Sequence, residues 1–337
     1  MGIEFKPSAR DYRGYGDKPP AVRWPNGARL ALSIVVNFEE GAELSLTRED
    51  ERNEYVYEIV ERIEGVPDAC MESHFAYGTR VGWPRIRALL QHYGVKATIN
   101  ACGRAVATSP WLAAEAVADG HEVSSHGWRW ERQAEMPEAH ERVVIGKSVE
   151  AIAAATGVPP VGWHTRSSTS PNTRRLLVEH GGFLYDSNAY DDDLPYVETV
   201  AGHPHVVLPY AFDSNDMRFT NNGGFVFAED FSRYCCDAFD RLYAEGATAP
   251  RMMTVGLHLR IIGRPGRIGG LERFLEHVGA RGGVWFARRD EIAHAWRAGV
   301  GLGPWTPTPP LSDSEAVAKA SSPKTMSQSG QDRQNST

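Results

Sequence analysis

Two adjacent carboxylates, Glu39 and Glu40, lie just past an apolar run, residues 30–36, and precede Gly41, where the backbone can turn. The run is typical of a buried strand. In folds built on parallel strands, catalytic groups gather at the carboxyl ends of the strands. Burying two like charges together costs free energy unless a cation, hydrogen-bond donors or a proton offsets it. The pair therefore indicates a catalytic site, with a solvated loop as the alternative.

Histidine, arginine and aspartate side chains stand at the ends of other predicted strands. His126 follows a short strand and precedes a glycine, His258 ends an apolar strand, Arg166 follows a further strand, and Asp186 stands in the candidate segment Tyr185–Ser187. A single histidine is more often a hydrogen-bonded core residue than a catalytic one. Together, however, these side chains predict one shared site, provided that the strands are parallel.

Three polar segments could add to this site. Residues 70–80 combine Glu72 with His, Tyr and Arg without clear periodicity, and we predict a loop that forms a substrate wall. Asn215 and Asp216 stand in a polar run that fits a site loop but also an ordinary turn. Residues 263–267 could bind an anion or form a solvated turn. No serine lies in a G-x-S-x-G turn, so a covalent nucleophile is not expected.

The elements that would position these residues alternate between strand-like and helix-like runs from residue 28 to about 298. The predicted strands are Leu30–Asn37, Lys96–Asn100, Glu122–Ser124, Val161–Trp163, Val206–Pro209, Met252–Leu257 and Gly283–Phe286, and the predicted helices are Trp83–Tyr93, Pro110–Asp119, Glu138–Thr156, Asn172–His180, Ala228–Glu245, Gly270–Ala280 and Asp290–Ala298. This α/β alternation predicts a parallel sheet, most economically closed into a barrel, with an open doubly wound sheet as the alternative. No G-x-G-x-x-G follows the first strand, so the usual dinucleotide signal is missing.

Composition narrows the classes of function. The 337 residues are 42% apolar, carry a formal net charge of −7 and have a pI near 6.0, so we expect neither a nucleic-acid partner nor a membrane partner. The four cysteines form no C-x-x-C pair and are expected to be reduced thiols. Residues 1–6 lack the apolar core of an export signal, and no 18-residue apolar stretch occurs, so we expect a cytoplasmic protein.

Three regions are predicted along the chain. Residues 1–27 form an extended arm with aromatic anchors, residues 28–300 form one catalytic domain, and residues 303–337, rich in Pro, Ser, Gln and Lys, form a disordered tail. The aromatic arm suggests contact with another subunit.

The chain resembles the NodB-type polysaccharide deacetylase superfamily, and within it the cofactor-independent allantoinases. The segments that carry the resemblance are Arg10–Tyr12 with Gly14–Gly16, Asn37–Gly41, Met71–Ser73, Ser125–Gly127, Ser170–Arg175, Tyr185–Ser187 with Asp192–Tyr196, Asn215–Phe219, and Gly256–His258 with Gly263–Arg267. The resemblance implies a single-domain distorted (β/α) barrel, hydrolysis of a non-peptide C–N bond and a homo-oligomer. The same branch includes fungal proteins named as chitin deacetylases.

The chain departs from the superfamily pattern at the metal site. Metal-dependent members use an Asp-Asp pair, and their other two ligands are spaced His-x-x-x-His; here Glu39 and Glu40 replace the acids, and Trp130 stands where the second histidine would follow His126. An indole N–H cannot bind a cation. A zinc ion would have only Glu40 and His126, so we expect no metal, although zinc is not excluded. Residues 163–170 also depart from the Tyr-Thr-Gly-Arg pattern of the allantoinase branch, which leaves allantoin itself open as the substrate.

The leading hypothesis is a cyclic-amide or ureide hydrolase in which water attacks a ring carbonyl. Glu39 or Glu40 would act as general base, Arg166 or an imidazolium would stabilise the oxyanion, and His258 would protonate the leaving nitrogen. The expected catalytic residues are Glu39, Glu40, His126, Arg166 and His258, and the expected substrate-binding residues are Glu72, Trp130, Asp186, Asn215 and Asp216. The alternatives are an N-deacetylase of chitin or peptidoglycan fragments and a non-catalytic barrel that binds a glycan or ureide.

Overall fold

The computed structural model describes residues 10–55, 61–166, 168–220 and 224–308. Its strands are β1 (Leu30–Phe38), β2 (Thr98–Ala101), β3 (Glu122–Ser125), β4 (Gly162–Trp163), β5 (Tyr185–Asp186), β6 (Tyr196–Val200), β7 (His203–Val207), β8 (Arg251–His258) and β9 (Val284–Phe286). Its α-helices are α1 (Ala69–Tyr77), α2 (Trp83–His92), α3 (Gly103–Thr108), α4 (Pro110–Ala118), α5 (Glu138–Thr156), α6 (Thr173–His180), α7 (Ala228–Glu245), α8 (Leu259–Ile262), α9 (Pro265–Gly279) and α10 (Arg289–Gly299). Most of the predicted tail, from residue 309 onward, lies outside the described residues.

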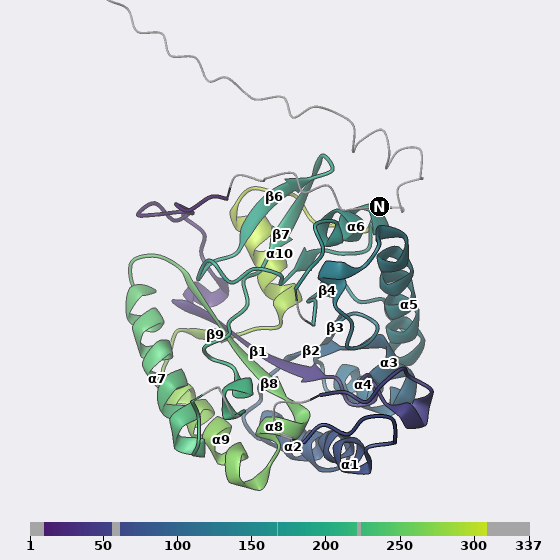
Figure 1. Ribbon diagram of the computed structural model, residues 1–337. Coiled ribbons are helices and arrows are strands. Elements are labelled where there is room, and N and C mark those ends of the chain that lie inside the picture. The colour runs from purple at the N-terminus through teal and green to yellow at the C-terminus, as the bar shows by residue number, and fades with distance from the viewer. Residues whose placement is uncertain (1–9, 56–60, 167, 221–223, 309–337) are drawn as a thin grey trace, which may run out of the picture.

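The strands form one curled sheet in the order β6-β7-β5-β4-β3-β2-β1-β8, with β9 paired to the first residues of β1. Neighbouring strands are parallel except for the β6–β7 hairpin. Within the described residues, the end strands β6 and β8 do not pair, so the barrel curls without closing. Helices surround it, with α7 and α9 along one flank and α3, α4 and α5 along the other (Figure 1). The expected single-domain, distorted (β/α) barrel is therefore confirmed.

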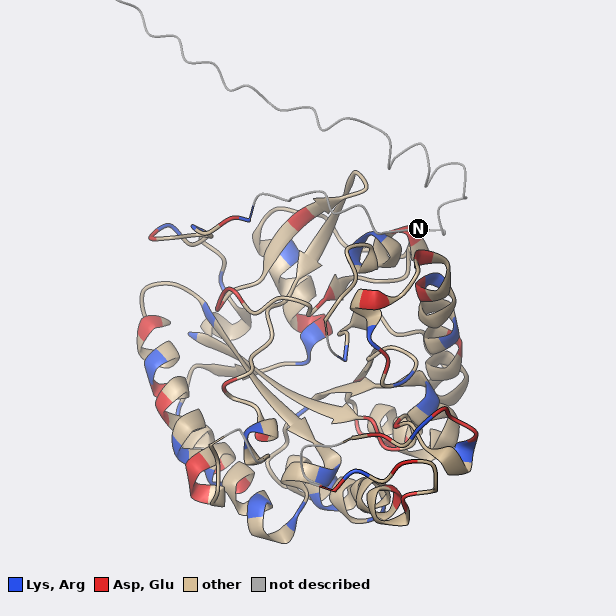
Figure 2. Cartoon of the chain, viewed as in Figure 1, with Lys and Arg blue, Asp and Glu red and all other residues tan. Residues whose placement is uncertain are grey.

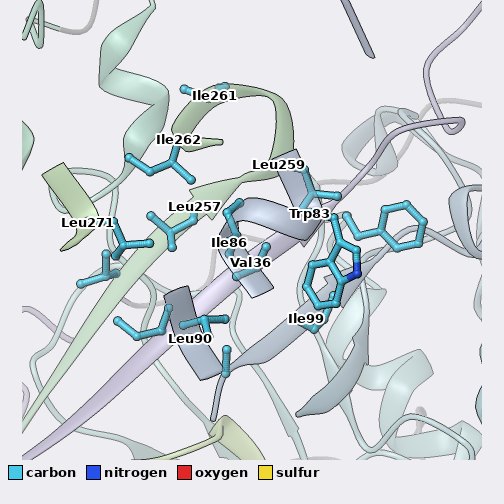
Figure 3. Close-up of a cluster of buried hydrophobic side chains, with 14 of the residues drawn as sticks. Val36, Trp83, Ile86, Leu90, Ile99, Leu257, Leu259, Ile261, Ile262 and Leu271 are labelled. Atoms are coloured by element: carbon cyan, nitrogen blue, oxygen red, sulfur yellow. The ribbon is translucent and has the colours of Figure 1, made fainter. Parts of the chain in front are cut away.

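The side chains of β1 are buried on both faces of the sheet. This strand pairs with β8 along its length, from Leu30 opposite Arg251 to Asn37 opposite His258. Apolar side chains from β1, β2 and β8 pack against α2, α8 and α9 in the cluster drawn in Figure 3. This rigid pairing fixes where the carboxylates after β1 stand relative to the histidine that ends β8.

Charged residues concentrate on the outer helices and the loops, whereas β1 and β8 carry almost none (Figure 2). Part of the N-terminal arm packs on the barrel: Trp24 is buried against Trp285 and Trp296, and its indole N–H donates to the Arg251 carbonyl at 2.9 Å. No helix among the described residues has both the length and the apolar character needed to cross a membrane.

The prediction of a loop over residues 70–80 was wrong, because this stretch forms α1 and the following π-helical turn Gly78–Gly82. Asp68 caps the helix by accepting the Met71 backbone N–H at 2.9 Å, and Met71 and Phe75 are buried on one face. Short elements escaped prediction as well, among them α3, β5 and β6. The predicted boundaries of α5 and α7 match the structure at both ends.

Candidate active site

The carboxyl ends of four strands bring the predicted residues together. In register across the sheet lie Asn37 of β1, Asn100 of β2, Ser124 of β3 and His258 of β8. Asn100 donates its amide N–H to Asn37 Oδ1 at 3.2 Å, and Ser124 donates its hydroxyl to Asn100. The strand ends that carry the candidate site residues are thus linked by a hydrogen-bonded polar layer, which holds them at fixed positions.

Glu39 lies at the centre of the site and is buried. Its Oε2 accepts from Arg260 Nη1 at 2.8 Å, and its Oε1 lies 3.4 Å from His126 Nε2. Burial would raise the pKa of Glu39, but His258, His126 and Arg260 outweigh it and hold this pKa well below its ordinary value. The Glu39 carboxylate is therefore ionised at neutral pH.

Glu40 is buried beside it but has different surroundings. Its Oε2 accepts the Glu39 backbone N–H at 3.1 Å, and its Oε1 lies 3.7 Å from Arg260 without a hydrogen-bond partner among the described residues. Gly78 makes room for this oxygen, because a Cβ there would collide with it. Burial, opposed by Arg260 and helped by the charge of Glu39, raises the pKa of Glu40 to about 7. The adjacent carboxylates therefore differ in protonation at neutral pH.

His258 faces this pair with its own acidic partner. Its Nδ1 lies 2.7 Å from Asp216 Oδ1, and Asp216 Oδ2 accepts the backbone N–H groups of His258 and Ile262 at 2.8 and 2.9 Å. Burial lowers the pKa of His258, but Asp216 and Glu39 outweigh it and raise this pKa above its ordinary value. The side chain of His258 keeps 13% of its surface exposed, so this imidazolium can meet a substrate.

Two stacked imidazoles line another side of Glu39. His126 and His164 lie with ring centroids 5.2 Å apart and planes within 12°. Nδ1 of His126 lies 2.6 Å from the carbonyl oxygen of His164, which can only accept, so Nδ1 carries a proton and Nε2 faces Glu39. Backbone carbonyls therefore fix the orientation of this ring, as they do for many catalytic imidazoles.

Aromatic and cationic groups close the site over the carboxylates. Trp130 is buried, packs edge-on against Phe75 at 5.4 Å, and has an indole N–H without a hydrogen-bond partner among the described residues. The guanidinium of Arg166 lies 3.7 Å from the Trp130 ring centroid, and that of Arg260 lies 5.1 Å from it. Trp130 thus holds two cations near the site by cation–π contact.

The structure does not place every predicted residue in this group. Glu72 accepts from the hydroxyls of Ser45 and Thr47, which ties α1 to the loop after β1. Asp186 is buried, with both oxygens bound by Arg174 and one also by His205. The side chain of Asn215 caps a short helix. The side chain of Asp216 orients His258.

Arg260 is the main residue that sequence reasoning missed. It stands two residues after His258, at the start of α8, and its guanidinium faces both Glu39 and Glu40. Two adjacent buried carboxylates call for a cation, which was a usable signal, but three arginines in residues 260–267 gave no way to choose among them. His164 was noted only as a departure from a pattern.

These residues do not fit a divalent cation. The carboxylates of Glu39 and Glu40 already face the Arg260 guanidinium, and Trp130 can only donate. Within the described residues, no three or more His, Cys, Asp or Glu side chains are arranged to hold a metal ion.

Comparison with known proteins gives consistent relatives. The polysaccharide deacetylase family model matches residues 65–185. A Schizosaccharomyces pombe protein, provisionally named as a polysaccharide deacetylase, is 39% identical over 311 residues, which cover 86% of this chain and 97% of that one. The crystal structure of Puue allantoinase has a TM-score of 0.84 and 44% identity, covering 89% of this chain and 100% of that one. The crystal structure of a probable polysaccharide deacetylase from Pseudomonas aeruginosa PAO1 has a TM-score of 0.83 and 46% identity, covering 86% and 98%.

Proposed function

Because the chain belongs to the polysaccharide deacetylase family, we propose that it hydrolyses a non-peptide C–N bond, and that its substrate is a cyclic amide or ureide such as allantoin. One observation carries this proposal: an ionised Glu39, bound to Arg260 at 2.8 Å, shares a site with the His258–Asp216 pair. Arg260 thus balances the charge of the proposed base Glu39, and Asp216 balances that of the proposed acid His258. Similarity to Puue allantoinase over that whole chain supports the choice of substrate.

In the proposed reaction, water attacks a carbonyl carbon of the ring while Glu39 takes one of its protons. Glu39 is preferred to Glu40 as the base, because a general base must be ionised and Glu40 has a pKa of about 7. Glu40 and His126 then position Glu39 and balance its charge. Arg260 keeps Glu39 ionised but also makes it a weaker base, so the reaction depends on close positioning of the water.

The same step places negative charge on the carbonyl oxygen, and the C–N bond then breaks. Arg166, held against Trp130 at the edge of the site, is the proposed oxyanion donor. One good donor of this kind contributes roughly 3 kcal/mol to transition-state stabilisation. The His258 imidazolium gives its proton to the departing ring nitrogen, and Asp216 stabilises the charged form beforehand.

The second candidate function is N-deacetylation of a polysaccharide such as chitin or peptidoglycan fragments; the names of the S. pombe and P. aeruginosa relatives favour a polysaccharide deacetylase without giving its substrate. It would use the same acid and base on an acetamide and release acetate. A cytoplasmic location is also a proposal, which cell fractionation would test. A homo-oligomeric state is another, which light scattering of the purified protein would test.

The deciding experiment is a substrate panel of allantoin, hydantoin, succinimide and chitin oligomers, assayed before and after exhaustive chelation. We expect ring opening that survives chelation, with less than stoichiometric metal by mass spectrometry. Loss of activity on chelation and its recovery with zinc would contradict a metal-free reaction. Acetate release without ring opening would establish the deacetylase instead, and no turnover of any substrate would leave a binding protein.

A further inference from the structure

His164 is the first residue after β4 and is held rigidly in the wall of the site. Its Nδ1 lies 3.0 Å from the carbonyl oxygen of Ser187, at the end of the next strand. Its ring stacks on His126 and lies 4.4 Å from the ring of Tyr210. This arrangement repeats that of His126 one strand further along the sheet, so its ring is as firmly oriented.

The hydrogen-bonding character of the ring follows from these contacts. A carbonyl oxygen can only accept, so Nδ1 carries the ring proton and Nε2 of the neutral ring carries a lone pair. Burial, together with the charges of His126 and Arg289, also holds the pKa of His164 well below its ordinary value. The ring therefore offers an acceptor and no second donor.

Nε2 of His164 is open to a ligand. This atom has no hydrogen bond with any residue that the structure describes, and it is not among the sealed, unpaired polar atoms of the described interior. Because the two stacked rings are nearly parallel and each is tied at Nδ1 to the next strand, their Nε2 atoms point the same way. On His126 that atom faces Glu39, so His164 presents its acceptor on the side of the proposed base.

We infer that Nε2 of His164 accepts a hydrogen bond from an N–H group next to the reacting carbonyl of the substrate, which makes His164 a specificity-determining residue. The inference deepens the proposed function and rests on it. It names the substrate class as amides and ureides that keep their N–H, and it excludes esters and N-alkylated rings. A site built around such a hydrogen bond rejects analogues that lack it, because its own buried polar group is then left unpaired.

The test compares hydantoin with 1-methylhydantoin and 3-methylhydantoin on the purified full-length protein. For the methylhydantoin that lacks the recognised N–H, we expect kcat/KM to be about 100-fold or more below that of hydantoin. In His164→Phe, which keeps an aromatic ring for stacking, hydantoin should lose about that factor and the methylated ring should lose little. His164→Gln keeps an acceptor and should restore part of the preference.

A histidine outside the site provides the matched control. His180, near the end of α6, packs against Phe183, and His180→Phe should leave the hydantoin-to-methylhydantoin ratio unchanged. Folding of each variant is checked by its thermal transition. If His164 had a purely structural role, its replacement would lower kcat/KM for both substrates alike. Their ratio would then stay unchanged, so this ratio separates recognition from stability.

The failure of this inference and that of the proposed function have different signatures. Ring opening by the wild type with no discrimination, or with discrimination that His164→Phe retains, overturns the inference and leaves the function intact. If the wild type opens no ring, calorimetric binding of the three hydantoins decides. Preference for the N–H ring that is lost in His164→Phe supports the inference, whereas equal binding, or no binding at millimolar concentration, overturns it.

Discussion

Both ends of the barrel interior bury a carboxyl, but they surround it differently. At the carboxyl ends of the strands, Glu39 and Arg260 are in direct contact at 2.8 Å. At the opposite end, Glu122, the first residue of β3, is bound by the hydroxyls of Thr98 and Tyr185 at 2.7 and 2.9 Å and by a backbone N–H. Burial and the charge of Asp290 raise the pKa of Glu122 to about 8, so this carboxyl is mostly protonated at neutral pH.

A second buried arginine of the barrel interior, Arg289, is bound by neutral oxygens. Arg289 begins α10, is buried, and has no ion pair with any described residue. Its guanidinium donates to the hydroxyls of Ser187 and Thr254 at 2.9 and 2.8 Å and to the carbonyl oxygens of Leu208 and Pro209. Neutral oxygens thus satisfy four of its hydrogen-bonding positions.

The comparison shows that burial alone does not identify a reactive carboxyl. Glu39 and Glu122 are both buried, yet nearby cations keep the first ionised, whereas burial and the charge of Asp290 keep the second protonated despite its neutral donors. Direct charge pairing supplies a base at neutral pH, whereas neutral hydrogen bonding holds strand and helix ends together without chemistry. The same difference in protonation separates Glu39 from Glu40 within the site, and the variants described next test how buried charges are balanced.

The largest effect is expected from Glu39→Gln compared with Glu40→Gln at neutral pH. Removing the proposed base should lower kcat/KM by about 1,000-fold or more, within the 10²–10⁴-fold range of general base catalysis. Glu40→Gln replaces a carboxyl that is already partly protonated, so we expect a loss of about 10-fold or less. Steady-state ring opening of both variants, with matched thermal transitions, measures the difference. Equal losses would mean that the two carboxylates share the role of base.

Arg289→Met should produce the largest loss of stability. The variant strands two carbonyl and two hydroxyl oxygens inside the barrel, so the free energy of unfolding should fall by about 3 kcal/mol or more. Denaturant unfolding measures this change. Arg289→Lys keeps the charge with fewer donors and should lose less, which also provides a folded variant if Arg289→Met fails to fold. A methionine variant as stable as the wild type would show that these hydrogen bonds contribute little.

Asp216→Asn should have an intermediate effect and should also shift the pH profile. His258 has a raised pKa that its Asp216 and Glu39 partners cause, and it must be protonated to act as the acid, so activity falls as pH rises through this pKa. Without the charge of Asp216, that fall should begin at lower pH, and kcat/KM near neutral pH should drop about 10–100-fold. A variant whose activity falls while its basic limb stays in place would assign Asp216 to stability alone.

The sequence was sufficient for the parts of this molecule that depend on local pattern. Buried strands such as β1 and long amphipathic helices such as α7 could be predicted closely, because their periodicity is continuous. The positions of Glu39, His126 and His258 at one end of the sheet followed from parallel strands alone. The two-residue strand β5 and α1, whose apolar residues follow no clear helical spacing, carry too little periodicity to be recognised.

What the sequence could not supply was the choice of partners across the barrel. Arg260 and Glu39 are 221 residues apart, and no spacing rule selects Arg260 over the other arginines near it. Asp186 looked like a site residue like those at the strand ends, but Arg174 and the buried His205 bind it. Distant partners determine which of several similar residues at strand ends remains available for chemistry.

The last variant, Glu122→Gln, tests the direction in which Glu122 makes the stability depend on pH. The pKa of Glu122 in the folded protein, about 8, exceeds the ordinary value of about 4.3, so the folded state holds a proton that the unfolded chain releases. Its contribution to stability is full below the unfolded pKa and is lost as pH rises to about 8. Glutamine cannot ionise, so the variant's free energy of unfolding should fall less steeply between pH 5 and 8, and above pH 8 the variant should gain stability relative to the wild type. Urea unfolding at several pH values measures the slope, with the exposed Glu150→Gln on α5 as control. Glu39 has a lowered pKa, so its contribution to stability is instead lost on acidification. An unchanged pH dependence of the unfolding free energy in Glu122→Gln would mean that both ends of the barrel bury ionised carboxylates and do not differ.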